Sequence, residues 1–529
     1  MNDSSWTRHS VAACLIIAAG FCWANQAPLW HTDVWVHAAY GRHILENDSF
    51  PKTDPLSPYT DPTIELGHWS WLTQITYAKL YEVGNWPFTE HPLDRVQCGA
   101  GTILAWHQLI WLLQTTFFWL AVRRIGTPGS VWPLISLGLY VLALHHATVI
   151  QRPQSLGFLF FIMLIWNLSA TSLKRSQFLI LPAIFALWAN CHGTFPIGLG
   201  VLALFILGRF FEVRFSIRQI LPLAGLGALA FLATWLNPHG PWIYEKIATF
   251  SGHPNLKTLS EWLPMKWEWH SQSAHWSYLA SILLIVVVML LGRQRPRWGH
   301  LLMILPLAIW PWLQFRTIVW WWVAVLWLLV QVCPGLALRF PTLPQWGEGS
   351  PSWIYRNIGI GLLIASLVTW YPVKRYIVPS PSYSAGTPVL IALGLQKYPG
   401  SSFFPELGQA VARYYPNGKY YGPIFASETQ GEFFVWHLGE QFPTLMFTHA
   451  HVFSTAHWQK CLEVKFGEEN SLNLLDEWGA NLVVVETSRH EELIKKLQGS
   501  TEWEQIIVED PTPATVESAR AIFLRKIRK

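Results

Sequence analysis

The stretch Trp276–Gly292, WSYLASILLIVVVMLLG, contains no charged residue and is followed directly by Arg293, Arg295 and Arg297. A helix rises about 1.5 Å per residue, so an apolar run of this length approaches the ~30 Å thickness of membrane hydrocarbon. Cationic side chains just beyond such a run are typical of the cytoplasmic end of a membrane-spanning helix. The stretch therefore predicts a membrane-spanning helix whose C-terminal end faces the cytoplasm.

The same kind of stretch recurs along most of the chain. Of its 529 residues, 51% are hydrophobic and only 13% are charged, and the mean hydropathy is +0.26. Soluble domains carry about 25% charged residues, so this composition excludes a disordered chain and argues against a purely soluble enzyme. We predict about eleven membrane-spanning helices, with approximate limits of 11–30, 99–122, 130–147, 154–172, 177–191, 194–209, 219–236, 276–292, 299–315, 317–338 and 353–372.

Charge and cysteine content exclude other classes of protein. The formal net charge of +5 is too small over this length to predict nucleic-acid binding. The six cysteines are scattered and form no Cys-x-x-Cys pair, so neither a disulfide framework nor a zinc ribbon is indicated. The 33 tryptophans suit a membrane protein, because tryptophan is enriched where a chain crosses the interface between membrane and water.

Lysine and arginine in the short loops predict the orientation of the chain. With the N-terminus inside, the cytoplasmic side receives Arg8, Arg123, Arg124, Lys174, Arg175, Arg209, Arg214, Arg218, Arg293, Arg295, Arg297 and Arg339. The other side receives a sparser set, which is the distribution that membrane proteins show. An odd number of spans then places the C-terminus outside. No clear Ala-x-Ala site follows the first span, so we expect that helix to be retained.

Two long outer loops and a C-terminal domain complete the predicted organisation. Residues 1–372 form the membrane module, with outer loops at 31–98 and 237–275 and helices expected at 33–45 and 68–81. Residues 373–385 are a linker rich in proline. Residues 386–529 are an extracytoplasmic α/β domain, with strands expected at 424–426, 444–447 and 482–485 and helices at 471–478 and 491–497.

Polar side chains gather at the outer ends of the predicted spans, where they are costly and therefore informative. They are Asp33, His37, Arg152, Asn190, His192, Glu261 and Arg316. A carboxylate can accept a proton from a hydroxyl, and arginine forms strong charge-assisted bonds to phosphate. The set suits transfer of a sugar from a lipid phosphate, because the lipid tail stays in the membrane while the chemistry occurs at its surface.

With these residues the sequence resembles the GT-C glycosyltransferases, polytopic enzymes that use polyprenyl-phosphate sugar donors. It is most similar to a group of large bacterial membrane proteins of this type, through short motifs spread over most of the chain. The motifs are Asp33-x-Trp35-x-His37-x-x-x-Gly41-Arg42, Asp54-Pro55-x-Ser57, His68-Trp69-x-Trp71-Leu72, Trp188-Ala-Asn190-x-His192-Gly193, Asn237-Pro238-x-Gly240, Glu261-Trp262 and Gly431-x-Phe433-x-x-Trp436.

The resemblance implies a role for Asp33, and the chemistry of the other site residues suggests theirs. Asp33 takes the place of the essential acid that follows the first span, and the arginines hold the donor phosphate. His37, Asn190, His192 and Glu261 are further substrate-binding candidates. Some members of the superfamily bind a divalent metal through two neighbouring acids, but Val34 and Trp35 follow Asp33 here, so no metal or other cofactor is expected.

Structural roles stay open for the same residues. Asp33 also suits the N-cap of the helix that follows it. Arg152 and Arg316 also fit arginines whose charged ends simply reach the membrane surface. Asn190 also suits a side chain that pairs with main-chain carbonyls where a helix ends, and histidines near the surface commonly anchor loops.

The sequence thus predicts a mainly α, polytopic membrane bundle with a C-terminal extracytoplasmic α/β domain, located in the bacterial inner membrane. The predicted activity is transfer of a sugar from a polyprenyl-phosphate donor to a glycan, lipid or protein acceptor outside the cytoplasm. Two other classes stay open. One is a transporter or flippase for lipid-linked sugars, and the other is a non-catalytic assembly or receptor protein.

Overall fold

The computed structural model describes residues 3–25, 33–84, 92–126, 130–170, 172–265, 273–291, 296–333, 405–415, 420–439, 442–487, 489–508 and 520–527. The span predicted at 353–372 and the linker predicted at 373–385 lie outside these residues. The chain forms two compact units. The helical unit comprises Met1–Ala27, Trp106–Tyr244 and Lys257–Pro379, and the mixed unit comprises Pro28–Ala105, Glu245–Leu256 and Ser380–Lys529.

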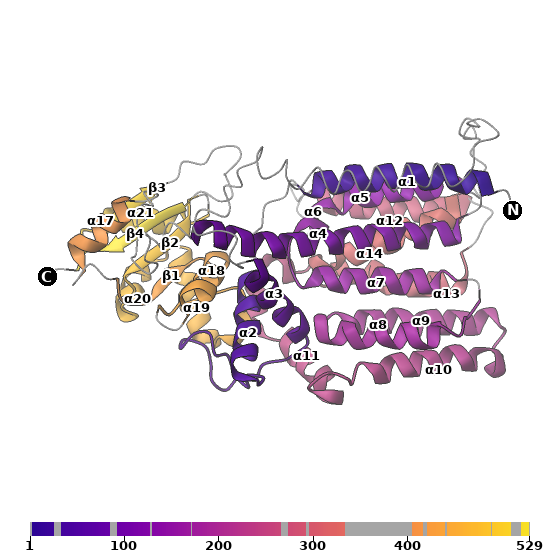
Figure 1. Cartoon of the computed structure of the whole chain (residues 1–529), viewed down its shortest axis with the longest axis horizontal. Coiled ribbons are helices and arrows are strands. Elements are labelled where there is room, and N and C mark those ends of the chain that lie inside the picture. Colours follow the sequence, from indigo (N-terminus) through magenta and orange to yellow (C-terminus); the bar gives the residue numbers. More distant parts are fainter. Residues whose placement is uncertain are drawn as a thin grey trace. The chain divides into compact units, whose positions relative to one another are not determined.

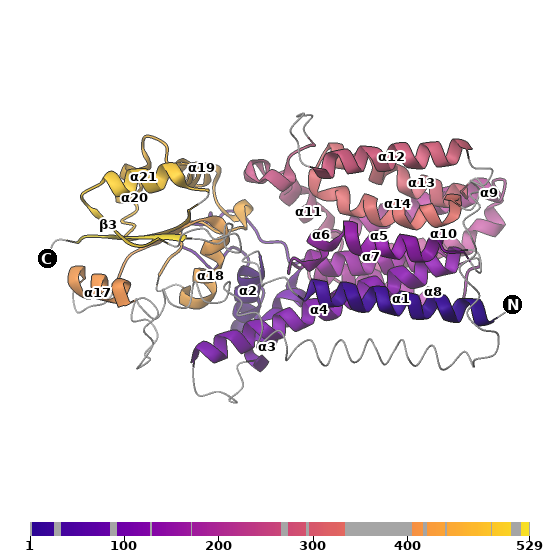
Figure 2. The same cartoon turned by 90° about the horizontal axis from the view of Figure 1, so that it is seen from above.

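The helical unit is a bundle whose long helices run side by side (Figures 1 and 2). Each span predicted between residues 11 and 338 overlaps at least one of its helices. They are α1 (Asp3–Ala24), α4 (Pro92–Ile125, shared with the mixed unit), α5 (Trp132–Ala143), α6 (His145–Val149), α7 (Gln154–Leu168), α8 (Gln177–Cys191), α9 (Phe195–Glu212), α10 (Ile217–Ala233), α12 (Ser273–Leu291), α13 (Trp298–Ile309) and α14 (Ile318–Val332), with short 3-10 turns η1 (Gly240–Trp242), η3 (Ser260–Trp262), η4 (Trp310–Trp312) and η5 (Phe315–Thr317).

The lengths of these helices bear on the predicted number of spans. Among the described residues, Phe195–Glu212 and Phe315–Val332 are long and apolar enough to cross a membrane, and seven further apolar helices are shorter. Prolines lie inside three helices, at Pro182 of α8, Pro222 of α10 and Pro306 of α13. Each proline removes one main-chain donor, but the three helices continue through these positions. The figure of eleven spans stays a prediction.

Close backbone approach and polar contacts join the helices of the bundle. A β-carbon at Gly208 of α9 would lie 2.4 Å from the carbonyl oxygen of Trp298, so only glycine allows α9 and α13 to pack this closely. The Ser136 hydroxyl of α5 donates to the Leu326 carbonyl of α14 at 2.7 Å. Small residues and hydroxyl groups are the usual means by which helices associate in a membrane.

The mixed unit combines the loop after α1 with the C-terminal residues. Its helices are α2 (Val34–Asn47), α3 (Trp71–Gly84), α11 (Ile243–Ser251), α17 (Pro405–Tyr414), α18 (Glu428–Leu438), α19 (Thr455–Lys465), α20 (Ser471–Glu477) and α21 (Glu491–Gly499), with turns η2 (Pro254–Thr258) and η10 (Ala450–Val452). Its strands are β1 (Ile424–Ala426), β2 (Leu482–Glu486), β3 (Trp503–Val508) and β4 (Arg520–Arg525).

The strands form one mixed sheet in the order β1-β2-β4-β3, with β1 parallel to β2 and the other pairs antiparallel. Figure 2 shows α19, α20 and α21 on one face of the sheet and α17 and α18 on the other. Every residue of β2 is buried, as expected for a strand covered on both faces. The predicted α/β class of the C-terminal residues agrees with this small sheet.

One predicted strand is wrong. Residues 444–447 form only an isolated bridge, in which Thr444 pairs with Ile424 of β1. The Thr444 carbonyl accepts a hydrogen bond from the Ser57 hydroxyl at 2.9 Å. The Thr444 carbonyl therefore contacts the loop between α2 and α3. Conversely, β3, β4, α17, α18 and α19 were not predicted.

The loop helices and the C-terminal residues share one core within the mixed unit. Trp35 of α2 is 2% exposed and packs edge-on against Phe433 of α18, with ring centroids 5.7 Å apart. Arg42 donates to the Trp436 carbonyl at 2.8 Å and lies over the Trp436 ring at 4.2 Å. A β-carbon at Gly41 would lie 2.0 Å from the Gln74 carbonyl oxygen, so glycine permits α2 to meet α3.

Candidate functional site

Three predicted site residues meet in the helical unit, and we call them the arginine–glutamate cluster: Arg152, Glu261 and Arg316. Arg152 lies in the turn that leads into α7, where Pro153 follows it. Proline is favoured at a helix start because its missing N–H would have no partner there. Glu261 is in η3, and Arg316 is in η5.

The two arginines share one carboxylate. Arg152 Nη1 lies 2.7 Å from Glu261 Oε2, and Arg316 Nη1 lies 3.3 Å from Glu261 Oε1. The three side chains keep 20–36% of their surface exposed, so the cluster is accessible at the surface of the unit. Its formal charge is +1, because two cations face one anion.

Neighbouring groups hold Arg316 in place. Its Nη2 donates to Gln154 Oε1 at 3.0 Å, and its guanidinium lies 4.6 Å from the centre of the Trp262 ring. A planar guanidinium stacked on an aromatic ring directs its N–H edge to polar ligands, and Gln154 and Glu261 contact that edge here. The cluster can therefore bind an oxyanion such as phosphate in place of the glutamate carboxylate.

Asp33 belongs to the mixed unit and precedes α2. Its φ of 49° lies in the left-handed region, which is uncommon for residues other than glycine and often marks a functional position. Its carboxylate makes no capping hydrogen bond to α2. Its main-chain N–H donates to Glu432 Oε1 at 2.8 Å, and the Thr448 hydroxyl donates to the same oxygen.

Glu432 is the main residue that the sequence analysis missed. It is 0% exposed and lies on α18, 399 residues from Asp33 along the chain. Buried carboxylates are rare unless they are paired, so a buried acid that holds the backbone of another acid is informative. The one sign in the sequence that Glu432 has a role was its position between Gly431 and Phe433 of the motif Gly431-x-Phe433-x-x-Trp436. No pattern in the sequence connects position 432 to position 33.

Histidines surround His37, which lies one helical turn after Asp33. The His37 ring is perpendicular to the His449 ring, with centroids 4.8 Å apart, and His37 Nδ1 lies 3.2 Å from Gln74 Nε2. Burial lowers the pKa of His449 to about 4, although the nearby charge of Asp33 acts in the opposite direction. Burial, reinforced by neighbouring histidines, also lowers the pKa of His451 well below its usual value. His449 and His451 are therefore neutral at pH 7.

A half-buried acid, Asp54, holds a neighbour of these histidines. The Tyr40 hydroxyl donates to Asp54, whose other carboxylate oxygen accepts the N–H groups of Leu56 and Ser57 at 3.1 and 3.2 Å. Burial raises the pKa of Asp54, while these hydrogen bonds act to lower it. The motif Asp54-Pro55-x-Ser57 thus forms a turn that fixes Tyr40, and Tyr40 stacks on His449.

Asn190 and His192 have contacts that join helix ends. The Asn190 side-chain amide donates to the carbonyls of Ala186 and Leu236, at 2.8 and 3.2 Å. Asn237 donates in turn to Asn190 Oδ1 at 3.3 Å. His192 Nδ1 lies 2.9 Å from the Thr194 hydroxyl. These contacts fit the structural role left open for Asn190, and a substrate role for either residue stays a prediction.

Metal binding has no candidate group in the described part of the chain. Among those residues, no three histidine, cysteine, aspartate or glutamate side chains are placed so that they could hold a metal ion. Cys14, Cys22, Cys333 and Cys461 are free thiols.

Comparison with known proteins gives a similarity of fold. No sequence family and no curated protein matches the chain. The oligosaccharyltransferase of Archaeoglobus fulgidus in its apo form is similar, with a TM-score of 0.51 and 12% identity over 91% of this chain and 70% of that one. The same enzyme tethered to an acceptor peptide containing the NVT sequon gives the same TM-score and identity over 91% and 69%.

A second similar structure is ArnT from Cupriavidus metallidurans bound to undecaprenyl phosphate. It has a TM-score of 0.48 and 14% identity over 98% of this chain and 97% of that one. The oligosaccharyltransferase is a GT-C glycosyltransferase, and the fold predicted from the sequence agrees with it at this level. The mostly helical chain with its small C-terminal sheet therefore has a fold similar to that of a GT-C membrane enzyme.

Proposed function

We propose that the protein is an integral-membrane glycosyltransferase that moves a sugar from a polyprenyl-phosphate donor to an acceptor outside the cytoplasm. The observation that carries the proposal is the arginine–glutamate cluster. Its members come from three separate segments, each was predicted to contact the substrate, and ion pairs join all three. Similarity of fold to an oligosaccharyltransferase supports the class of reaction.

The cluster is the proposed site of the donor phosphate. Arg152 and Arg316 present two guanidinium groups to one carboxylate, and a phosphate offers the same kind of oxygen acceptors with more negative charge. Glu261 holds the arginines together until the donor binds and then gives way to the phosphate. When the bond between sugar and phosphate breaks, the arginines stabilise the charge that develops on the leaving phosphate.

Asp33 is the proposed general base. Its carboxylate accepts the proton of the acceptor hydroxyl as the oxygen attacks the anomeric carbon of the sugar. The electron pair of the broken carbon–oxygen bond stays with the phosphate, and water later removes the proton from Asp33. Glu432 acts as a positioning residue, because its bond to the Asp33 N–H fixes the unusual backbone conformation that directs this side chain.

Substrate identity is the broadest part of the proposal. The donor is a polyprenyl-phosphate sugar, and the acceptor is a glycan, a lipid or a protein of the cell envelope. The structurally similar oligosaccharyltransferase has been captured with an acceptor peptide, which supports a protein acceptor among these classes. His37 is proposed to line the acceptor side, because it lies on the same helical face as Asp33.

The test is transfer by the purified full-length protein. A panel of radiolabelled polyprenyl-phosphate sugars is incubated with envelope fractions, and labelled products are separated from donor. Asp33→Asn should lower kcat by roughly 10²–10⁴-fold, the usual contribution of a general base. Asp48→Asn is the matched control, because Asp48 lies at the other end of α2 and has a φ of 48°. Full activity of a folded Asp33→Asn variant would remove Asp33 from the mechanism.

The same preparation separates the other two classes. Movement of donor lipid across proteoliposomes without any new glycosidic product would indicate a transporter. Partner binding that survives Asp33→Asn, Arg152→Gln and Arg316→Gln together, with no turnover in the wild type, would indicate a non-catalytic protein.

A further inference from the structure

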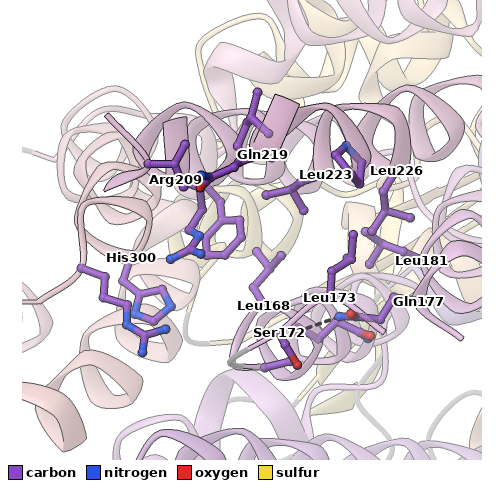
Figure 3. Close-up of a pocket in the computed structure, with 17 residues that line it drawn as sticks. Leu168, Ser172, Leu173, Gln177, Leu181, Arg209, Gln219, Leu223, Leu226 and His300 are labelled. Atoms are coloured by element: carbon purple, nitrogen blue, oxygen red, sulfur yellow. Dashed lines mark hydrogen bonds between the residues drawn. The ribbon is translucent and has the colours of Figure 1, made fainter. Parts of the chain in front are cut away.

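A second polar site lies in the helical unit, away from the arginine–glutamate cluster. A cavity of about 260 Å³ opens among the ends of α7, α8, α9, α10 and α13 (Figure 3). Arg152 lies just before the first residue of α7, whereas Leu168, the last residue of α7, lines the cavity. With 15 residues in α7, roughly 20 Å of helix separates the two places. The cavity is therefore distinct from the proposed donor phosphate site.

The wall of the cavity has two chemically different parts. The polar part includes Arg209, Arg297, Gln219 and Ser172, and the apolar part includes Leu168, Leu181, Leu223 and Leu226. Figure 3 shows Arg209 beside His300 on one side, with Leu181, Leu223 and Leu226 on the other. A ligand that fills this cavity must combine a polar, anionic end with an apolar part.

No acidic residue lines the cavity among the described residues, and its positive charge is only partly compensated. Arg209 pairs with Glu212, whose Oε1 accepts the Gly299 N–H at 2.9 Å. That network holds Arg209 in place and offsets its charge. Arg297 is exposed and forms no ion pair with any residue that the structure describes, so it supplies the charge available to a ligand.

Other polar groups of the wall are already engaged and make it rigid. His300 Nδ1 lies 3.0 Å from Gln331 Oε1, and the Gln177 amide donates to the Asn167 carbonyl at 3.1 Å while its oxygen accepts the Lys174 N–H. These contacts shape the cavity before any ligand binds. A preformed site loses less conformational entropy on binding.

We infer that this cavity binds the phosphate headgroup of an anionic phospholipid, with an acyl chain along its leucine wall. Arg297 would contact the phosphate, and Gln219 and Ser172 would donate hydrogen bonds to it. Basic pockets between membrane helices on the cytoplasmic side commonly hold such headgroups, because that leaflet is rich in anionic lipid. The cavity lies at the end of the helices for which the loop arginines predict a cytoplasmic location.

The test is lipid binding to the full chain in detergent, followed by native mass spectrometry. Phosphatidylglycerol and phosphatidylethanolamine are titrated separately, and soluble glycerol phosphate is offered as a competitor. We expect the wild type to prefer phosphatidylglycerol by about tenfold, which is 1.4 kcal/mol. Arg297→Gln should abolish the preference, and Leu223→Trp should weaken binding of both lipids by filling the apolar part.

Arg175→Gln is the matched control, because Arg175 is an exposed arginine near the same helix ends but does not line the cavity. Equal losses in Arg297→Gln and Arg175→Gln would show general surface attraction and overturn the proposal. Full competition by glycerol phosphate, with no effect of Leu223→Trp, would show a site for a soluble phosphate compound and overturn the lipid assignment. Absence of any preference in the wild type would overturn it as well.

Discussion

Replacing Glu261 by glutamine should strengthen binding of the donor lipid phosphate. In the structure the carboxylate forms ion pairs of 2.7 and 3.3 Å with Arg152 and Arg316. A phosphate that binds the arginines must first break these pairs. Glutamine keeps the size of the side chain and one acceptor oxygen but removes the charge, so the competition weakens.

The magnitude follows from the exposure of the cluster. The side chains are 20–36% exposed, and ion pairs with this much contact with water contribute about 0.5–1 kcal/mol each. Two pairs give about 1–2 kcal/mol, which corresponds to roughly 5–30-fold tighter binding. The gain should shrink at high salt, because solvent ions screen partly exposed charges.

The assay is equilibrium binding of a polyprenyl phosphate to purified protein. A radiolabelled polyprenyl phosphate supplies the signal, because the chain contains 33 tryptophans and the fluorescence of Trp262 alone cannot be followed. Glu65→Gln is the control, because Glu65 also pairs with a cation, Lys246, but belongs to the mixed unit. Weaker binding in Glu261→Gln would mean that the carboxylate itself contacts the donor. Unchanged binding would mean that the phosphate binds elsewhere.

Three further predictions concern the mixed unit. Glu432→Ala should destabilise it by about 1–3 kcal/mol in chemical unfolding, because the Asp33 N–H and the Thr448 hydroxyl lose a buried acceptor; an unchanged midpoint would contradict this. Trp35→Ala should cost about 3–5 kcal/mol, because a buried ring is removed from the core, and thermal unfolding measures it. The pKa of His449 is about 4 in the folded protein and near 6.5 in the unfolded chain. The free energy of unfolding should therefore be highest above about pH 6.5 and fall toward pH 4, by up to about 1.4 kcal/mol per pH unit, because the unfolded chain binds the proton first. His449→Gln should flatten this pH profile.

The sequence predicted the elements whose patterns are local. Apolar runs located the helices of the bundle, and the Asp33 to Leu45 periodicity located α2. The placement of Arg152, Glu261 and Arg316 on one side of the membrane was predicted, because the arginines lie beside predicted span ends and Glu261 lies in an outer loop, but the ion pairs between them were not predicted. Long apolar runs allow such reasoning, since both ends of each helix are known once the run is found.

Other features depend on contacts that no local pattern contains. β3 is an edge strand, and Glu504 and Gln505 give it a polar sequence that edge positions tolerate. The contact between Glu432 and Asp33 depends on how α18 packs on α2, and the order of the residues does not indicate it. Residues 444–447 were wrongly predicted to form a strand, because an apolar segment that lies beside a strand has the same composition as a strand.

The mixed unit is formed by segments that lie far apart in the sequence, and this has a consequence for folding during synthesis. Its first segment ends at Ala105, and its last begins at Ser380. At about 5–20 residues per second, a ribosome needs roughly 14–55 s to translate the intervening chain. Throughout that time α2 and α3 lack the partner that covers Trp35, so nascent protein depends on chaperones or membrane lipid to shield them. A shortened chain that ends before α18 would leave this aromatic surface exposed and become a target for proteases.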